Sequence, residues 1–430
     1  MFESFRLFLI IFGTVLIFLW LFTYRDKETR VFFLFFTIMY LIYSGIGGAL
    51  EDATPTYTTY YFVFTCCISL GIYIGLKRKC NQRASNNSWS NFFDYFLERY
   101  ANKIIIFYYI LLLLQLIYPE NKLVNLITPP SPDVLSMLRE KYQGDGTDLF
   151  TTIISQIETI FYPFFLLSLY KYRKDTIKLT IIVLGTYYID YCISAYLGRG
   201  SMIQALLIVL TFTYFYRPKL GKMILISSIV LLPTLLIFLV QYSITRIGGT
   251  AESISGMEAI GEILKQESGY PLHFEGILGL QAKYRLNYLI WLFTMPLPGV
   301  FRGGIDANLT ALLSESLLGL SRDNKGFYIL LPGVVGESVF LLGQNLYWLN
   351  GILYGWLMGK TYRILSRHQQ LFGLLIAAAL CFGYTTNRAG VFSGFPFILK
   401  VLLYFYFILL FLKRKLKGKI KLYVNRDQSL

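Results

Sequence analysis

Charged residues are scarce in this chain of 430 residues. They make up 15% of the sequence, whereas hydrophobic residues make up 55%. A soluble globular domain carries about 25% charged residues, so the composition excludes a soluble enzyme and a disordered chain. The formal net charge of +15 therefore does not indicate a nucleic-acid partner, and the chain is predicted to be a polytopic membrane protein.

Residues that hold metals or form disulfides are also few, with five cysteines and two histidines. The cysteines all fall in predicted spans or on the predicted cytoplasmic side, so no disulfide framework is expected. No group of histidines, cysteines and carboxylates has metal-ligand spacing, and no glycine-rich loop for a nucleotide phosphate is found. We therefore expect neither a metal nor a cofactor.

Long apolar runs are abundant. Each covers roughly 20 residues, enough for a helix to cross a hydrocarbon layer about 30 Å thick. Since open sheet edges are not tolerated in lipid, the fold class is an all-α membrane domain covering residues 1–430. We predict about eleven spans, at 5–24, 31–50, 57–76, 104–119, 150–170, 178–197, 201–216, 223–242, 340–359, 370–387 and 397–412.

Basic residues gather in every second connection, which fixes the predicted orientation because Lys and Arg are retained in the cytoplasm. The clusters lie at 25–30, 77–103, 171–178, 217–222, 360–367 and 413–426. The N-terminus then faces outward. One long outward connection spans 243–339, and its apolar spacing at 254–264 and 305–320 predicts helices lying flat at the membrane interface.

Four arginines stand outside the basic clusters, each within two residues of a glycine, and the predicted topology places all four on the outward face. They are Arg199, Arg246, Arg302 and Arg388. Guanidinium groups bind phosphate through paired N–H bonds. Arg285, beside an aromatic stretch, is a weaker fifth candidate. The alternative for each arginine is that it anchors its own helix end to lipid phosphate.

Acid–base candidates are fewer. Glu337 follows Gly336 at the predicted outward surface, while Glu158 and Asp190 lie inside predicted spans, where carboxylates are functional candidates. For Glu337, a structural ion pair with an arginine is the alternative. His273, in the long connection, is a candidate general base, although a lone loop histidine is often without a catalytic role.

Taken in order, these motifs resemble the O-antigen polymerases (the Wzy family). The resemblance is carried by Gly198-Arg199-Gly200-Ser201, by Arg246, by 331–338 with its Gly336-Glu337, and by Arg388-Ala389-Gly390. It implies a GT-C-like, metal-independent glycosyltransferase of the bacterial inner membrane with its active site facing the periplasm. The arginines would hold an undecaprenyl-diphosphate-linked donor, and Glu337 would match the family's Gly-Glu. A chain-length regulator is an expected partner by resemblance alone, beside the lipid-linked donor and acceptor and the membrane lipids.

Two other functions stay open. An O-antigen ligase shares the architecture and the donor, uses lipid A-core as acceptor, and would be expected to depend on a histidine in the long connection, such as His273. A flippase for lipid-linked oligosaccharides would carry out no chemistry, but two similar halves and charged residues along a mid-membrane cavity would be expected. Here the polar candidates gather at one predicted surface, which favours the enzyme.

Overall fold

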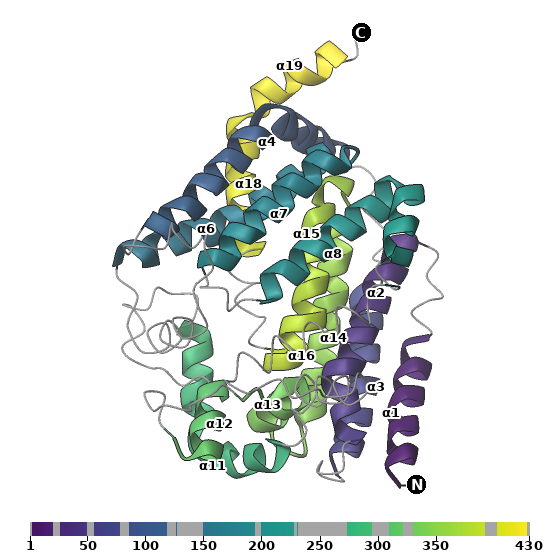
Figure 1. Cartoon of the computed structure of the whole chain (residues 1–430). Coiled ribbons are helices and arrows are strands. Elements are labelled where there is room, and N and C mark those ends of the chain that lie inside the picture. The colour runs from purple at the N-terminus through teal and green to yellow at the C-terminus, as the bar shows by residue number, and fades with distance from the viewer. Residues whose placement is uncertain are drawn as a thin grey trace. The chain divides into compact units, whose positions relative to one another are not determined.

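The computed structural model describes residues 2–19, 26–49, 56–77, 86–117, 126, 149–193, 199–227, 230, 273–294, 309–320, 330–391 and 402–427, and the described residues contain helices but no strand (Figure 1). Within the described residues, five helical segments are long and apolar enough to cross a membrane: Lys27–Ala49, Tyr57–Leu76, Ile153–Tyr172, Thr176–Ile193 and Gln369–Ala389. Three shorter apolar helices cover Phe5–Leu19, Ser201–Tyr216 and Gly333–Leu342. The described residues are thus all-helical, as predicted, and their apolar helices are compatible with a membrane protein. The count of eleven spans and the long outward connection stay predictions.

The chain forms two compact units, which are described separately. The first contains Met1–Lys77, Val230–Arg363 and Ala378–Pro396, and the second contains Arg78–Ile229, Ile364–Ala377 and Phe397–Leu430. Helices of the first unit are α1 (Phe2–Leu19), α2 (Lys27–Tyr40), η2 (Leu41–Gly45), η3 (Ile46–Ala49), α3 (Tyr57–Leu76), α11 (Phe274–Thr294), α12 (Leu309–Leu318), α13 (Gly333–Leu342), α14 (Tyr347–Leu365), η9 (Cys381–Thr385) and α16 (Thr386–Ala389). The first unit includes α14 as far as Arg363.

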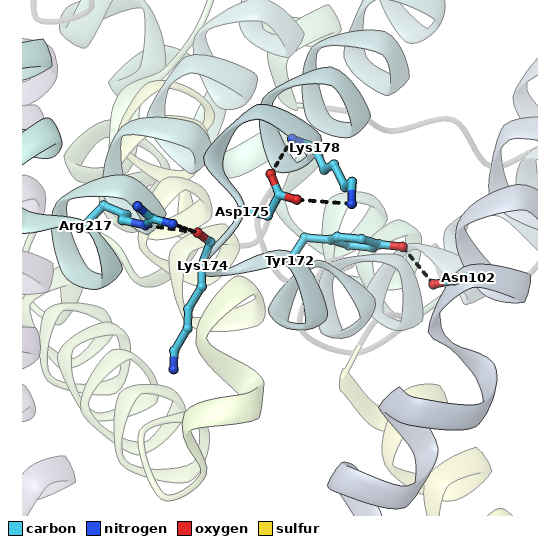
Figure 2. A network of polar contacts seen from close by, with 6 residues as sticks. All are labelled: Asn102, Tyr172, Lys174, Asp175, Lys178 and Arg217. Atoms are coloured by element: carbon cyan, nitrogen blue, oxygen red, sulfur yellow. Dashed lines mark hydrogen bonds and ion pairs between the residues drawn. The ribbon is translucent and has the colours of Figure 1, made fainter.

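Helices of the second unit are α4 (Asn86–Ile117), α6 (Leu149–Leu169), η5 (Tyr170–Tyr172), α7 (Thr176–Ile193), α8 (Arg199–Tyr216), η8 (Gln369–Leu371), α15 (Phe372–Leu380), α18 (Tyr404–Lys415) and α19 (Lys417–Asp427). The second unit includes α15 as far as Ala377. The turn between α6 and α7 is tied to its neighbours by polar contacts (Figure 2). Arg217 donates from Nε and Nη2 to the carbonyl of Lys174, at 3.0 and 2.7 Å. Tyr172 donates to Asn102 Oδ1 at 2.8 Å.

In the first unit, α3 and α14 pack backbone against backbone. A Cβ at Gly71 or Gly355 would collide with the main chain of the facing helix. Glycines spaced four apart, Gly71 and Gly75 on α3 and Gly351, Gly355 and Gly359 on α14, give the flat surfaces that let two membrane helices approach this closely.

The predicted ninth span, 340–359, is divided in the structure. Its first residues belong to α13, which ends at Gly343, and its remainder belongs to α14. The cause is local: Gly343 has φ 81° and ψ 171°, a conformation that non-glycine residues rarely adopt. The prediction of one continuous helix there is wrong, and α13 is a separate short helix that carries Glu337.

Parts of the long connection 243–339 are helical. The predicted helix at 305–320 is confirmed over α12, whereas the predicted helix at 254–264 lies outside the described residues. α11, between these two segments, was not predicted as a helix; it covers Phe274–Thr294. Its inner face joins α12 and α13 in one apolar cluster that includes Ile277, Trp291, Leu313 and Phe340.

Candidate functional site

The best-defined polar site of the first unit is centred on Glu337. This carboxylate lies on α13 and is 0% exposed. Tyr288 of α11 donates a hydrogen bond to Glu337 Oε1 at 2.5 Å, and a buried charged group needs such partners. The predicted outward carboxylate is therefore held inside the unit, where it does not face solvent.

Gly390 closes the other side of this carboxylate. It follows α16, its φ is +111°, and a Cβ built on it would collide with the carboxyl group of Glu337. In Figure 1, α13 and α16 lie side by side in the first unit. The structure thus brings together Gly336-Glu337 and Arg388-Ala389-Gly390, two of the motifs that the sequence singled out.

Arg388 is the one predicted phosphate-binding arginine whose side chain the structure describes. It is half-buried. Its Cζ lies 4.9 Å from the ring centroid of Tyr384 and 5.6 Å from that of Tyr43, and its Nη1 donates to the Tyr384 hydroxyl. The two rings meet edge to face, with centroids 5.5 Å apart.

Both tyrosines come from π-helical turns. Tyr43 lies in η2, at the end of α2, and Tyr384 lies in η9, just before α16. Each π turn has one more residue than an α turn and often marks a functional site. Neither tyrosine could be predicted from the sequence as part of a site, because hydropathy gives no signal for a π turn.

His273 precedes α11 at the edge of the same unit and is half-buried. Burial lowers the pKa of its imidazole, because leaving water disfavours the charged form. The ring of Phe274, its neighbour, packs edge-on against Tyr57 at 5.4 Å. One helical turn further, the side chain of Ile277 packs against Gly336. The histidine therefore directly precedes the helix that packs against the Glu337 segment.

The structure does not describe the side chains of the other four predicted arginines. Arg246 and Arg302 lie outside the described residues. Arg199 begins α8 and Arg285 lies within α11, but the side chains of both are outside the described part of the structure. Convergence of the five arginines on one site remains a prediction.

The second unit holds the other two predicted carboxylates in a satisfied network. Glu158 accepts hydrogen bonds from Tyr108 at 2.8 Å and from Gln115 at 2.9 Å. Asp190 accepts one from Ser201 at 2.5 Å. The Ser201 contact links α7 to the first turn of α8, next to Arg199. Both carboxylates therefore have a structural role, because each one joins two helices through hydrogen bonds.

Metal-ligand groups of three or more residues are not found among the described residues, and no disulfide joins the described cysteines Cys66, Cys67, Cys192 and Cys381 to one another. Comparison of the chain with protein-family models, with curated proteins and with solved structures gives no match.

Proposed function

We propose that the chain is a polymerase of lipid-linked oligosaccharides in the bacterial inner membrane. It transfers a growing O-antigen glycan from undecaprenyl diphosphate to the non-reducing end of an incoming lipid-linked repeat unit, at the periplasmic face. The observation that carries the proposal is the contact of Gly390 with Glu337. This contact brings the Arg388-Ala389-Gly390 motif against α13, which contains Gly336-Glu337, within the first unit.

The required chemistry matches the groups that this unit presents. The anomeric C–O bond to the diphosphate breaks, and its electron pair leaves with the undecaprenyl diphosphate. A bond then joins the anomeric carbon to the acceptor hydroxyl oxygen. Arg388 is proposed to stabilise the negative charge of the leaving group, since fixed donors aimed at developing charge lower reaction barriers. Arg199, Arg246, Arg302 and Arg285 are proposed to bind the same diphosphate.

The acceptor proton needs a base. We assign that role to His273, whose lowered pKa keeps the imidazole neutral at pH 7 and able to accept a proton. Glu337, with no exposed surface, is assigned instead to holding the Arg388 turn in place. This assignment selects His273 over Glu337 as the base.

Deletion of the gene tests the function. Loss of a polymerase leaves lipopolysaccharide with a single repeat unit on the core, whereas loss of a ligase or a flippase leaves no repeat on the core. Gel analysis of lipopolysaccharide from the deletion strain separates these outcomes. A core without repeats would contradict the proposal and favour the ligase or the flippase.

Arg388→Ala tests the site. We expect chain extension to fall on the order of 10²-fold, as after loss of one oxyanion donor, with the protein still in the membrane. Arg388→Lys should recover only part of the activity, because lysine lacks the paired N–H geometry. Arg363→Ala is the matched control, since Arg363 of the same unit donates to a backbone carbonyl, that of Lys77. Long chains from Arg388→Ala would contradict the assignment.

A further inference from the structure

In the proposed function, Arg388 stabilises the negative charge of the diphosphate, which requires that its side chain is kept in one orientation. A long guanidinium side chain has many rotamers, and freezing it on binding costs affinity. Two aromatic rings contact this side chain, with their centroids 4.9 and 5.6 Å from its Cζ. We infer that Tyr43 and Tyr384 are positioning residues that orient the Arg388 guanidinium for the diphosphate.

The two rings have different roles in this arrangement. Tyr384 lies one helical turn before Arg388 and contacts it through both its ring and its hydroxyl. Tyr43 comes from a segment more than 300 residues away in sequence and is 8% exposed. Tyr43 thus fixes the guanidinium relative to α2, and Tyr384 fixes it relative to its own helix.

Ring contacts suit a phosphate-binding arginine. The negative face of an aromatic ring attracts the cation, and this attraction takes up no N–H donor of the guanidinium. The Tyr384 hydroxyl in addition accepts a hydrogen bond from Arg388 Nη1. The N–H donors of an arginine form the fork that matches a phosphate, and at Arg217 both Nε and Nη2 are used on a backbone carbonyl (Figure 2).

The π turns explain why both rings meet at this point. The extra residue in a π turn shifts the side chains that follow it relative to those before it. η9 packs against α2 and η2 packs against α16, and the tyrosines of the two π turns meet edge to face. The two π turns thus place the rings of Tyr43 and Tyr384 against the Arg388 guanidinium.

This inference rests on the proposed function, so its test uses two measurements on the full-length protein in lipid nanodiscs. The first is the dissociation constant for undecaprenyl diphosphate. The second is the rate at which phenylglyoxal modifies Arg388, followed by peptide mass analysis without any ligand. Only the first measurement depends on the proposed substrate.

Tyr43→Leu and Tyr384→Leu remove the rings. We expect each to weaken diphosphate binding and to accelerate modification of Arg388 by about two- to thirty-fold, the range of a single cation–π contact. Tyr43→Phe should keep both values, and Tyr384→Phe should fall between, because it keeps the ring and loses the hydroxyl. Tyr60→Leu is the control, since Tyr60 pairs with Tyr347 at 4.8 Å in the same unit.

Wild-type rates of Arg388 modification in both leucine variants would overturn the inference, whatever the binding result. Faster modification together with unchanged diphosphate binding would also overturn it. If modification accelerates but the wild-type protein does not bind undecaprenyl diphosphate, the proposed function fails together with the diphosphate part of the inference. Weaker binding and faster modification in the leucine variants but not in Tyr60→Leu would support it.

Discussion

Position 390 excludes a side chain for two independent reasons. Its backbone, at φ 111° and ψ 167°, lies in a region that only glycine adopts without strain, and its Cα faces the carboxyl group of Glu337. We predict that Gly390→Ala lowers the free energy of unfolding by more than the roughly 1–3 kcal/mol of backbone strain alone, and that chain extension is lost with it.

The measurement is a thermal unfolding curve in detergent, beside an assay of chain length in cells. Gly319→Ala is the matched control. Gly319 also has a positive φ, of 63°, but no atom lies within 4 Å of a Cβ built there, so this variant reports strain without a collision. Equal destabilisation by the two substitutions would show that contact with Glu337 adds nothing.

Among the elements, the pair α3 and α14 is the most sensitive to side-chain size. A Cβ at Gly355 would collide with the carbonyl oxygen of Ile68 and lie 2.8 Å from the backbone nitrogen of Ile72. Since backbone cannot rotate away as a side chain can, we predict that Gly355→Leu separates the helices and costs about 1–3 kcal/mol or more.

Thermal unfolding of Gly355→Leu in detergent, with Gly279→Ala as control, tests this packing. Gly279 lies inside α11 of the same unit with no atom within 4 Å of a built Cβ, so alanine there should leave stability unchanged or raise it by up to about 1 kcal/mol. An unfolding temperature of Gly355→Leu equal to that of the wild type would contradict close backbone packing.

Elements with a simple hydropathy signal were predictable from the sequence. The predicted span 57–76 coincides with α3, and 150–170 and 201–216 lie within a residue or two of α6 and α8. Predictions failed where the backbone departs from a continuous α-helix or where polar residues interrupt it. The break at Gly343 divides one predicted span, and Lys283, Arg285 and Asn287 conceal the full length of α11.

The candidate site was predictable only in its parts. Glu337, Arg388 and His273 stand out in the sequence because charged or titratable groups are rare there. Their arrangement depends on contacts between α13, α16 and the π turn η2, which lie far apart along the chain. Tyr43 and Tyr384 carry no signal of their own among the 34 tyrosines of the sequence.

At the scale of the whole molecule, the proposed diphosphate site requires Arg199 and Arg388 to reach the same side of the membrane. The positive-inside rule predicts this sidedness, and it predicts the opposite side for Lys174 and Lys219, both exposed in the second unit. In a variant without native cysteines, Arg199→Cys and Arg388→Cys should react in intact spheroplasts with a maleimide that cannot cross the membrane. Lys174→Cys and Lys219→Cys should react only after permeabilisation. Two guanidinium groups on opposite sides of a bilayer cannot bind one diphosphate, so labelling of positions 199 and 388 from different sides would contradict a shared site. That result would leave the contacts of Arg388 with Tyr43 and Tyr384 unaffected.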